Sequence, residues 1–121
     1  MPVFPVRHVD KPWGGEDIFA HTERYVGKIL TIHAGHALSR QYHEEKDETI
    51  FVLSGELVLE IGAEQDLERR VMGPGEAFHV TPGTIHRFVA EKDVVLAEVS
   101  TPELDDVVRL EDRYGRVPTD G

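Results

Sequence analysis

Apolar and β-branched residues recur along this chain in short runs that end at glycine, proline or acidic turns. The clearest run, Glu56 to Ile61, alternates so that Leu57, Leu59 and Ile61 share one face. No segment between residues 25 and 100 keeps the 3.6-residue period of an amphipathic helix. The pattern predicts strands over residues 25–33, 49–53, 56–61, 67–72, 76–80, 85–90 and 94–100. Short strands at this spacing are typical of an all-β sandwich or barrel.

The two ends of the chain give weaker signals. Residues 1–12 contain three prolines, which predicts an extended arm. Residues 104–110 fit either one helical turn or a final strand, and the pair Asp105 and Asp106 favours irregular structure there. A length of 121 residues suits one domain. We therefore expect a single domain over 1–121, with an arm at 1–12, a barrel at about 13–100 and a tail at 101–121.

Composition excludes several classes of function. The absence of cysteine excludes disulfides and thiolate metal sites. With 23 acidic and 13 basic residues, the net charge of −10 disfavours nucleic-acid binding, which requires a basic face. No apolar run approaches the roughly 20 residues that cross a bilayer, and the N-terminus lacks the apolar region of a signal peptide. We expect a cytoplasmic protein without nucleic-acid or membrane partners.

Four residues have the spacing of a metal site. Gln41 and His43 are two apart, so on a strand they point to the same face. Glu48 follows a polar stretch that can bend and return its carboxylate beside His43, and His86 follows a Pro-Gly turn. In a closed sheet these side chains can face one another. A mixed nitrogen and oxygen set without sulfur suits one divalent ion of Zn, Mn, Fe, Co or Ni.

The same residues carry a resemblance to a known family. The chain resembles the two-part signature of the cupin superfamily, and the matching positions are Gly35, Gln41, His43, Glu48 and Gly55, then Gly75, Pro82, Gly83 and His86. Three further segments look like the isomerase domain of type II mannose-6-phosphate isomerases: residues 11–14, 38–43 and 108–116. The resemblance covers roughly residues 11–116.

This resemblance implies a cupin double-stranded β-helix, also called a jelly-roll barrel. It further implies a metal held by Gln41, His43, Glu48 and His86, and aldose–ketose isomerisation of a sugar phosphate. The candidate catalytic residues are Lys46, Glu48 and Arg116. The base that moves the proton between C1 and C2 of the sugar stays open among Lys46, His36 and, if it is not a ligand, Glu48. His36 is also the likeliest substitute ligand.

The chain departs from the family pattern beside the ligands. Lys46 stands at the position of an arginine, and Thr49 and Ile50 replace a His-Trp pair. Lysine is a point charge that cannot reproduce bidentate binding by arginine. This leaves two other functions open: a non-catalytic metallo-cupin that binds a sugar or small molecule, and, with less support, a metal-dependent oxygenase.

Several residues keep a structural alternative. The two histidines can be hydrogen-bonded core residues, Glu48 a solvated carboxylate, and Gln41 a group that only orients substrate or water. Trp13 can pack across the barrel end or stack on a sugar. The basic residues can bind a phosphate or form surface ion pairs, and these are Lys28, Arg40, Lys46, Arg87, Arg109, Arg113 and Arg116. A homodimer is expected because small barrels often protect edge strands by pairing, and the apolar run 94–97 is one candidate interface.

Overall fold

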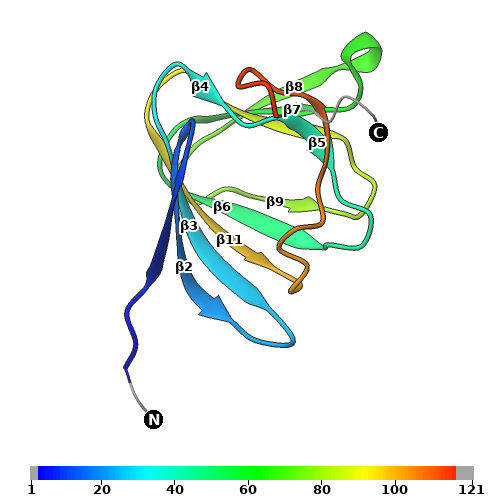
Figure 1. Ribbon diagram of the computed structural model, residues 1–121. Coiled ribbons are helices and arrows are strands. Elements are labelled where there is room, and N and C mark those ends of the chain that lie inside the picture. The colour runs from blue at the N-terminus through cyan, green and yellow to red at the C-terminus, as the bar shows by residue number, and fades with distance from the viewer. Residues whose placement is uncertain (1–2, 117–121) are drawn as a thin grey trace.

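Two antiparallel sheets face each other in the computed structural model, which describes residues 3–116 (Figure 1). The first sheet has the order β1 (Arg7–Lys11), β2 (Gly14–His21), β3 (Val26–Ile32), β11 (Val94–Ser100), β6 (Glu48–Gly55) and β9 (Ala77–Val80). The second has the order β12 (Val108–Glu111), β5 (Arg40–Tyr42), β10 (His86–Ala90), β7 (Leu57–Ile61) and β8 (Glu68–Met72), with β4 (His36–Ala37) also paired to β10. A 3₁₀ turn, η1 (Glu64–Asp66), lies between β7 and β8.

The topology confirms the predicted all-β double-stranded β-helix. β11 pairs with both β3 and β6, and β10 pairs with both β5 and β7, so segments far apart in sequence lie side by side in each sheet. All seven predicted strands are present within a residue or two of their expected bounds. No helix among residues 3–116 is long and apolar enough to span a membrane.

The core fills the space between the sheets. It contains the inward-facing residues of the alternating strands, including Leu57 and Leu59, which are fully buried as the Glu56–Ile61 pattern predicts. Trp13 is only 2% exposed and belongs to this cluster, which favours packing over sugar stacking. Gly55 allows the tight passage from β6 to β7: its φ is +82°, and a Cβ there would lie 2.1 Å from the Asp93 carbonyl oxygen.

Five strands went unpredicted, among them the short β4 and β5 that precede His43. Residues 14–21 form β2, where Glu16 and Asp17 break the apolar run. Residues 7–11 of the expected arm form β1, which pairs with β2 along its length. The preference for irregular structure over residues 104–110 was wrong from Val108 onward, because β12 pairs with β5 there. Residues 117–121 of the expected tail lie outside the described residues.

Candidate metal centre

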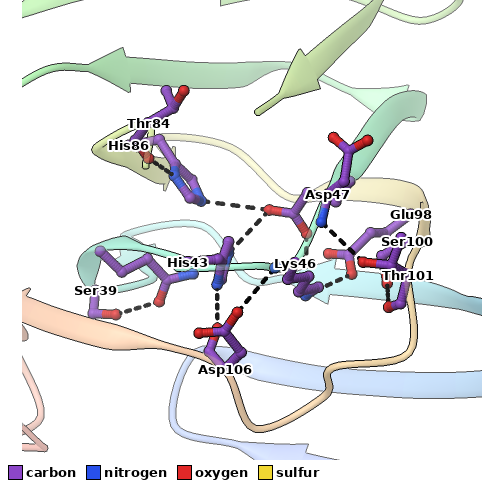
Figure 2. Close-up of polar contacts among 12 residues, drawn as sticks. Ser39, His43, Lys46, Asp47, Thr84, His86, Glu98, Ser100, Thr101 and Asp106 are labelled. Atoms are coloured by element: carbon purple, nitrogen blue, oxygen red, sulfur yellow. Dashed lines mark hydrogen bonds and ion pairs between the residues drawn. The ribbon is translucent and has the colours of Figure 1, made fainter. Parts of the chain in front are cut away.

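Three of the four predicted ligands converge at one end of the barrel. His43 follows β5 directly, Glu48 begins β6 and His86 begins β10. Ligand atoms of these residues all lie within 4.8 Å of one another, and all three side chains are buried. Figure 2 shows the imidazoles of His43 and His86 directed at one carboxylate. The polar stretch 44–47 therefore returns Glu48 to His43, as its sequence predicts.

Backbone carbonyls orient both imidazoles. His43 Nδ1 donates to the carbonyl oxygen of Asp106 at 2.5 Å, and His86 Nδ1 donates to that of Thr84 at 2.9 Å. A carbonyl only accepts, so each Nδ1 carries a hydrogen, and in the neutral form of each ring Nε2 presents a lone pair. These Nε2 atoms lie 3.2 Å and 3.5 Å from Glu48 Oε1. The imidazoles are thus in the form that binds a metal ion.

These three side chains fit a metal ion because one of their buried ligand atoms has no hydrogen-bond partner. His86 Nε2 is fully buried and has no hydrogen-bond partner among the described residues. Burial disfavours the ionised form of Glu48, but contacts from His43, His86 and Lys46 outweigh it and hold the pKa of this carboxyl well below 4.5. A carboxylate and two imidazole lone pairs aimed at one point are suited to a divalent cation.

Gln41 lies beside this group. It pairs across the strands with His86, and its side chain lines the same cavity as His43. Its Oε1 accepts a hydrogen bond from Ser39 Oγ at 2.6 Å, which fixes the orientation of the amide. Gln41 stays a candidate for a fourth ligand or for a group that orients a bound molecule.

A chain of buried charges extends from Glu48 along the inner face of the first sheet. Lys46 Nζ lies 3.2 Å from Glu48 and 3.1 Å from Glu98. Lys28 Nζ then lies 3.6 Å from Glu98 and 3.2 Å from Glu16. Burial and the neighbouring Glu48 carboxylate raise the pKa of Glu98 to about 7. Neither Glu98 nor Glu16 was predicted from the sequence, although Glu98 lies on the inward face of β11 together with Val94 and Leu96.

Two of the candidate catalytic bases, Lys46 and His36, are engaged in contacts with other residues. Burial lowers the pKa of Lys46, but Glu98 and Glu48 outweigh it and raise the pKa above its usual value, so Lys46 is held as an ammonium. His36 is not part of the His43–Glu48–His86 group, because its Nδ1 is paired with the Tyr114 hydroxyl at 2.7 Å. The remaining described histidines are also outside that group.

A cavity of about 370 Å³ opens beside the His43–Glu48–His86 group, which we call the metal group. His43, Gln41 and Trp13 contribute to its wall, and so does the candidate catalytic residue Arg116. Its basic lining residues are Arg7, Lys11, Lys28, Lys46, Arg109 and Arg116. Within residues 3–116, two acidic residues line it, Glu16 and Asp105. Arg40 and Arg87 lie outside this lining in ion pairs with Glu60 and Glu111, and Arg113 is exposed.

Comparisons with known proteins agree with this architecture. A family model described as a cupin domain matches residues 28–100. The chain is 35% identical over 116 residues to mannose-1-phosphate guanylyltransferase ManC from Salmonella typhimurium, and 31% identical over 115 residues to xanthan biosynthesis protein XanB from Xanthomonas campestris. These matches cover 92% and 91% of this chain, but it spans only 23% and 24% of those two relatives.

Solved structures give the same picture. KdgF from Halomonas sp. superposes with a TM-score of 0.71 at 25% identity, covering 82% of this chain and 88% of that one. The capsular polysaccharide assembling protein CapF from Staphylococcus aureus superposes with a TM-score of 0.76 at 18% identity. That match covers 90% of this chain and 35% of CapF, and at this identity it supports the fold alone.

Proposed function

The chain belongs to the cupin domain family, and from this premise we propose that it binds one divalent metal ion and isomerises a sugar phosphate between its aldose and ketose forms. The observation that carries the proposal is the convergence of His43, Glu48 and His86 beside a cavity rich in basic residues. The resemblance of residues 11–14, 38–43 and 108–116 to type II mannose-6-phosphate isomerases supports the reaction. The names of relatives such as mannose-1-phosphate guanylyltransferase support a phosphorylated sugar.

In this proposal, His43, Glu48 and His86 hold the ion, with Gln41 as the candidate fourth ligand. A divalent ion at this point supplies Lewis acidity to an oxygen of the bound sugar. The carbonyls of Asp106 and Thr84 keep the two imidazoles in the ligating tautomer. Lys46 holds Glu48 ionised and adds positive charge to the cavity wall.

The proton transfer requires a base that touches the sugar carbons. Among the three candidates, Lys46 is protonated, His36 is bonded to Tyr114, and Glu48 is not among the residues that line the cavity. Glu48 has two oxygens: Oε1 faces the imidazoles and Oε2 contacts Lys46. We therefore assign Glu48 the ligand role, leave the base unassigned, and place Arg116 at the cavity wall as a substrate contact.

The test is direct turnover. Protein loaded in turn with Zn, Mn, Fe, Co or Ni is incubated with mannose 6-phosphate, and fructose 6-phosphate is followed in a coupled assay. We expect turnover with at least one metal, and none from His43→Ala loaded in the same way. Absence of product with every metal and several hexose phosphates rejects the isomerase.

A second candidate, a non-catalytic metallo-cupin, is favoured by one observation: Lys46 is locked between two carboxylates at the position where the related isomerases carry an arginine. A rise in melting temperature with mannose 6-phosphate in the absence of turnover would support this candidate. A metal-dependent oxygenase, which the two histidines and one carboxylate also suit, would instead consume oxygen with iron bound.

A further inference from the structure

We propose that Arg109 and Arg116 form a binding site for a phosphate monoester dianion, separate from the metal centre but in the same cavity. This inference rests on the proposed function in taking the ligand to be a phosphorylated sugar. It adds where the phosphate binds, and that binding there requires no metal. Both residues line the cavity, and both belong to the C-terminal segment.

The strand register fixes the location of this site. Arg109 on β12 pairs with Gln41 on β5, and Gln41 pairs with His86 on β10. Because neighbouring strands lie about 4.8 Å apart, the backbone of Arg109 lies roughly 10 Å from that of the metal-site residue His86. A ligand with a carbonyl at one end and a phosphate at the other can therefore reach both sites at once.

The guanidinium of Arg109 has a hydrogen-bond donor without a partner inside the protein. Its Nε is buried without a hydrogen-bond partner among the described residues, and it forms no ion pair within residues 3–116. Burial, and then the positive charge of Arg116, lower the pKa of Arg109. Two like charges brought together at a cavity wall cost free energy that an anion between them would recover.

Arg116 is held in position by its own segment. Its Nε and Nη2 donate to the two carboxylate oxygens of Asp112 at 2.8 Å and 3.1 Å, and the Asp112 side chain is 0% exposed. The guanidinium carbon also lies 5.8 Å from the centre of the Tyr114 ring. Among the described residues Nη1 has no recorded partner, so one edge of the guanidinium stays available. Asp112 is thus a positioning residue for Arg116.

The charge balance of the cavity favours an anion. The whole chain carries −10, yet this cavity has six basic and two acidic lining residues. Lys28 and Lys46 are neutralised by buried glutamates, and Arg116 is paired with Asp112. Arg7, Lys11 and Arg109 form no ion pair among the described residues. Of these three, Arg109 is the one that pairs with Gln41 in the sheet, which makes it the primary phosphate contact.

The experiment measures binding after the metal has been removed with a chelator. Isothermal titration of the metal-free protein is carried out with mannose 6-phosphate, with mannose and with inorganic phosphate. We expect mannose 6-phosphate to bind, inorganic phosphate to compete with it, and mannose to bind at least about tenfold more weakly, as the loss of charge-assisted hydrogen bonds predicts. Arg109→Gln should weaken mannose 6-phosphate binding by at least about tenfold.

Arg113→Gln is the matched control, because it removes the same charge from an exposed position of the same segment. Its affinity should stay near that of the wild type. Arg109→Lys keeps the charge but not the two parallel hydrogen bonds, so an intermediate affinity is expected. If Arg109→Gln unfolds, Arg109→Lys and competition by inorganic phosphate still decide the outcome. Equal affinity for mannose and mannose 6-phosphate, or equal losses in Arg109→Gln and Arg113→Gln, would overturn the site.

This result is independent of turnover. Phosphate-dependent binding that Arg109→Gln removes supports the site even where no isomerase activity is found. Conversely, an active isomerase whose KM for mannose 6-phosphate is unchanged in Arg109→Gln keeps the proposed function and rejects the site.

Discussion

The imidazole of His43 is hydrogen-bonded to the backbone carbonyl of Asp106, 63 residues further along the chain. The side chain of the same aspartate accepts the backbone N–H groups of Glu44, Glu45 and Lys46 at 3.1, 2.7 and 2.9 Å. Asp106 therefore holds both a proposed ligand and the loop that leads to the next one. The metal group depends on this contact between the barrel and its C-terminal segment.

Asp106→Ala is expected to loosen this loop. Three N–H groups lose a charged acceptor, which should cost about 1–3 kcal/mol of unfolding free energy and lower metal affinity. Urea unfolding and metal titration measure the two effects. Asp105→Ala, at the exposed neighbouring position, serves as the control. A loss of stability without any change in metal affinity would show that the loop held by Asp106 does not position the metal ligands.

Removal of either imidazole should abolish stoichiometric metal binding. His43→Ala and His86→Ala each leave two of the three converging ligand groups, and elemental analysis of the purified proteins measures the result. His79→Ala changes an exposed histidine paired with Asp47 and should retain the metal. Metal retention in both site variants would show that the ion binds elsewhere.

Metal affinity should fall as the pH drops below about 6.5, because the ligating imidazoles must be neutral. Competition with a chromogenic chelator between pH 5.5 and 8 measures this dependence, with the chelator calibrated at each pH. The expected curve declines toward acid and levels off toward alkaline pH. An affinity that stays constant across this range would contradict ligation by histidine.

Glu98 should make the metal-free protein more stable at pH 5 than at pH 7.5. Its pKa of about 7 in the folded protein exceeds the usual 4.5, so the folded state binds the extra proton between these values. The stabilisation is full below 4.5 and is lost as the pH rises through 7, by at most about 3 kcal/mol. Glu48 has the opposite sign: its contribution is present above 4.5 and is lost below it.

Denaturant unfolding of the wild type and of Glu98→Gln at both pH values isolates this effect, because the histidines titrate equally in the two proteins. The substitution should flatten the decline between pH 5 and pH 7.5. The same slope in both proteins would assign the pH dependence to other groups.

Lys46→Met should destabilise the protein by about 3–5 kcal/mol, because it leaves two buried carboxylates without their shared cation. Lys92→Met, in the exposed turn before β11, should change stability by less than about 0.5 kcal/mol. Thermal and urea unfolding of both variants check this. If Lys46→Met leaves the free energy of unfolding unchanged, the ammonium between Glu48 and Glu98 does not stabilise the fold.

The expected homodimer stays a prediction, and its interface can be narrowed. Val94 and Leu96 of the apolar run 94–97 are fully buried in the core, so they are not available to a partner. The outward face of the same sheet instead exposes Phe51 and Val99. Light scattering should give twice the chain mass for the wild type and one chain mass for Phe51→Glu. A monomeric wild type would reject the dimer.

The sequence was sufficient for the barrel because its alternation is regular where both sheets bury one face. It also pointed to His43, Glu48 and His86, since turns of glycine, proline and charged residues mark the strand ends at which they lie. Those signals are local, and they act within a few residues of each ligand.

The features that the sequence did not reveal depend on distant contacts. β2 has polar residues because Glu16 faces a buried lysine from the neighbouring strand, so its pattern does not look apolar. The pairing of Glu98 with Lys28 and Lys46 requires the register of β11 against β3 and β6, which no local pattern specifies. The same holds for Asp106 and His43, which are brought together only by the finished fold.

The link between His43 and Asp106 also orders events in time. Before the C-terminal segment is in place, the loop 44–47 can already bring Glu48 to His43, but the carbonyl that fixes the His43 tautomer is absent. Binding of an ion should therefore follow the docking of residue 106, and a chain truncated before this residue should bind metal more weakly than the wild type.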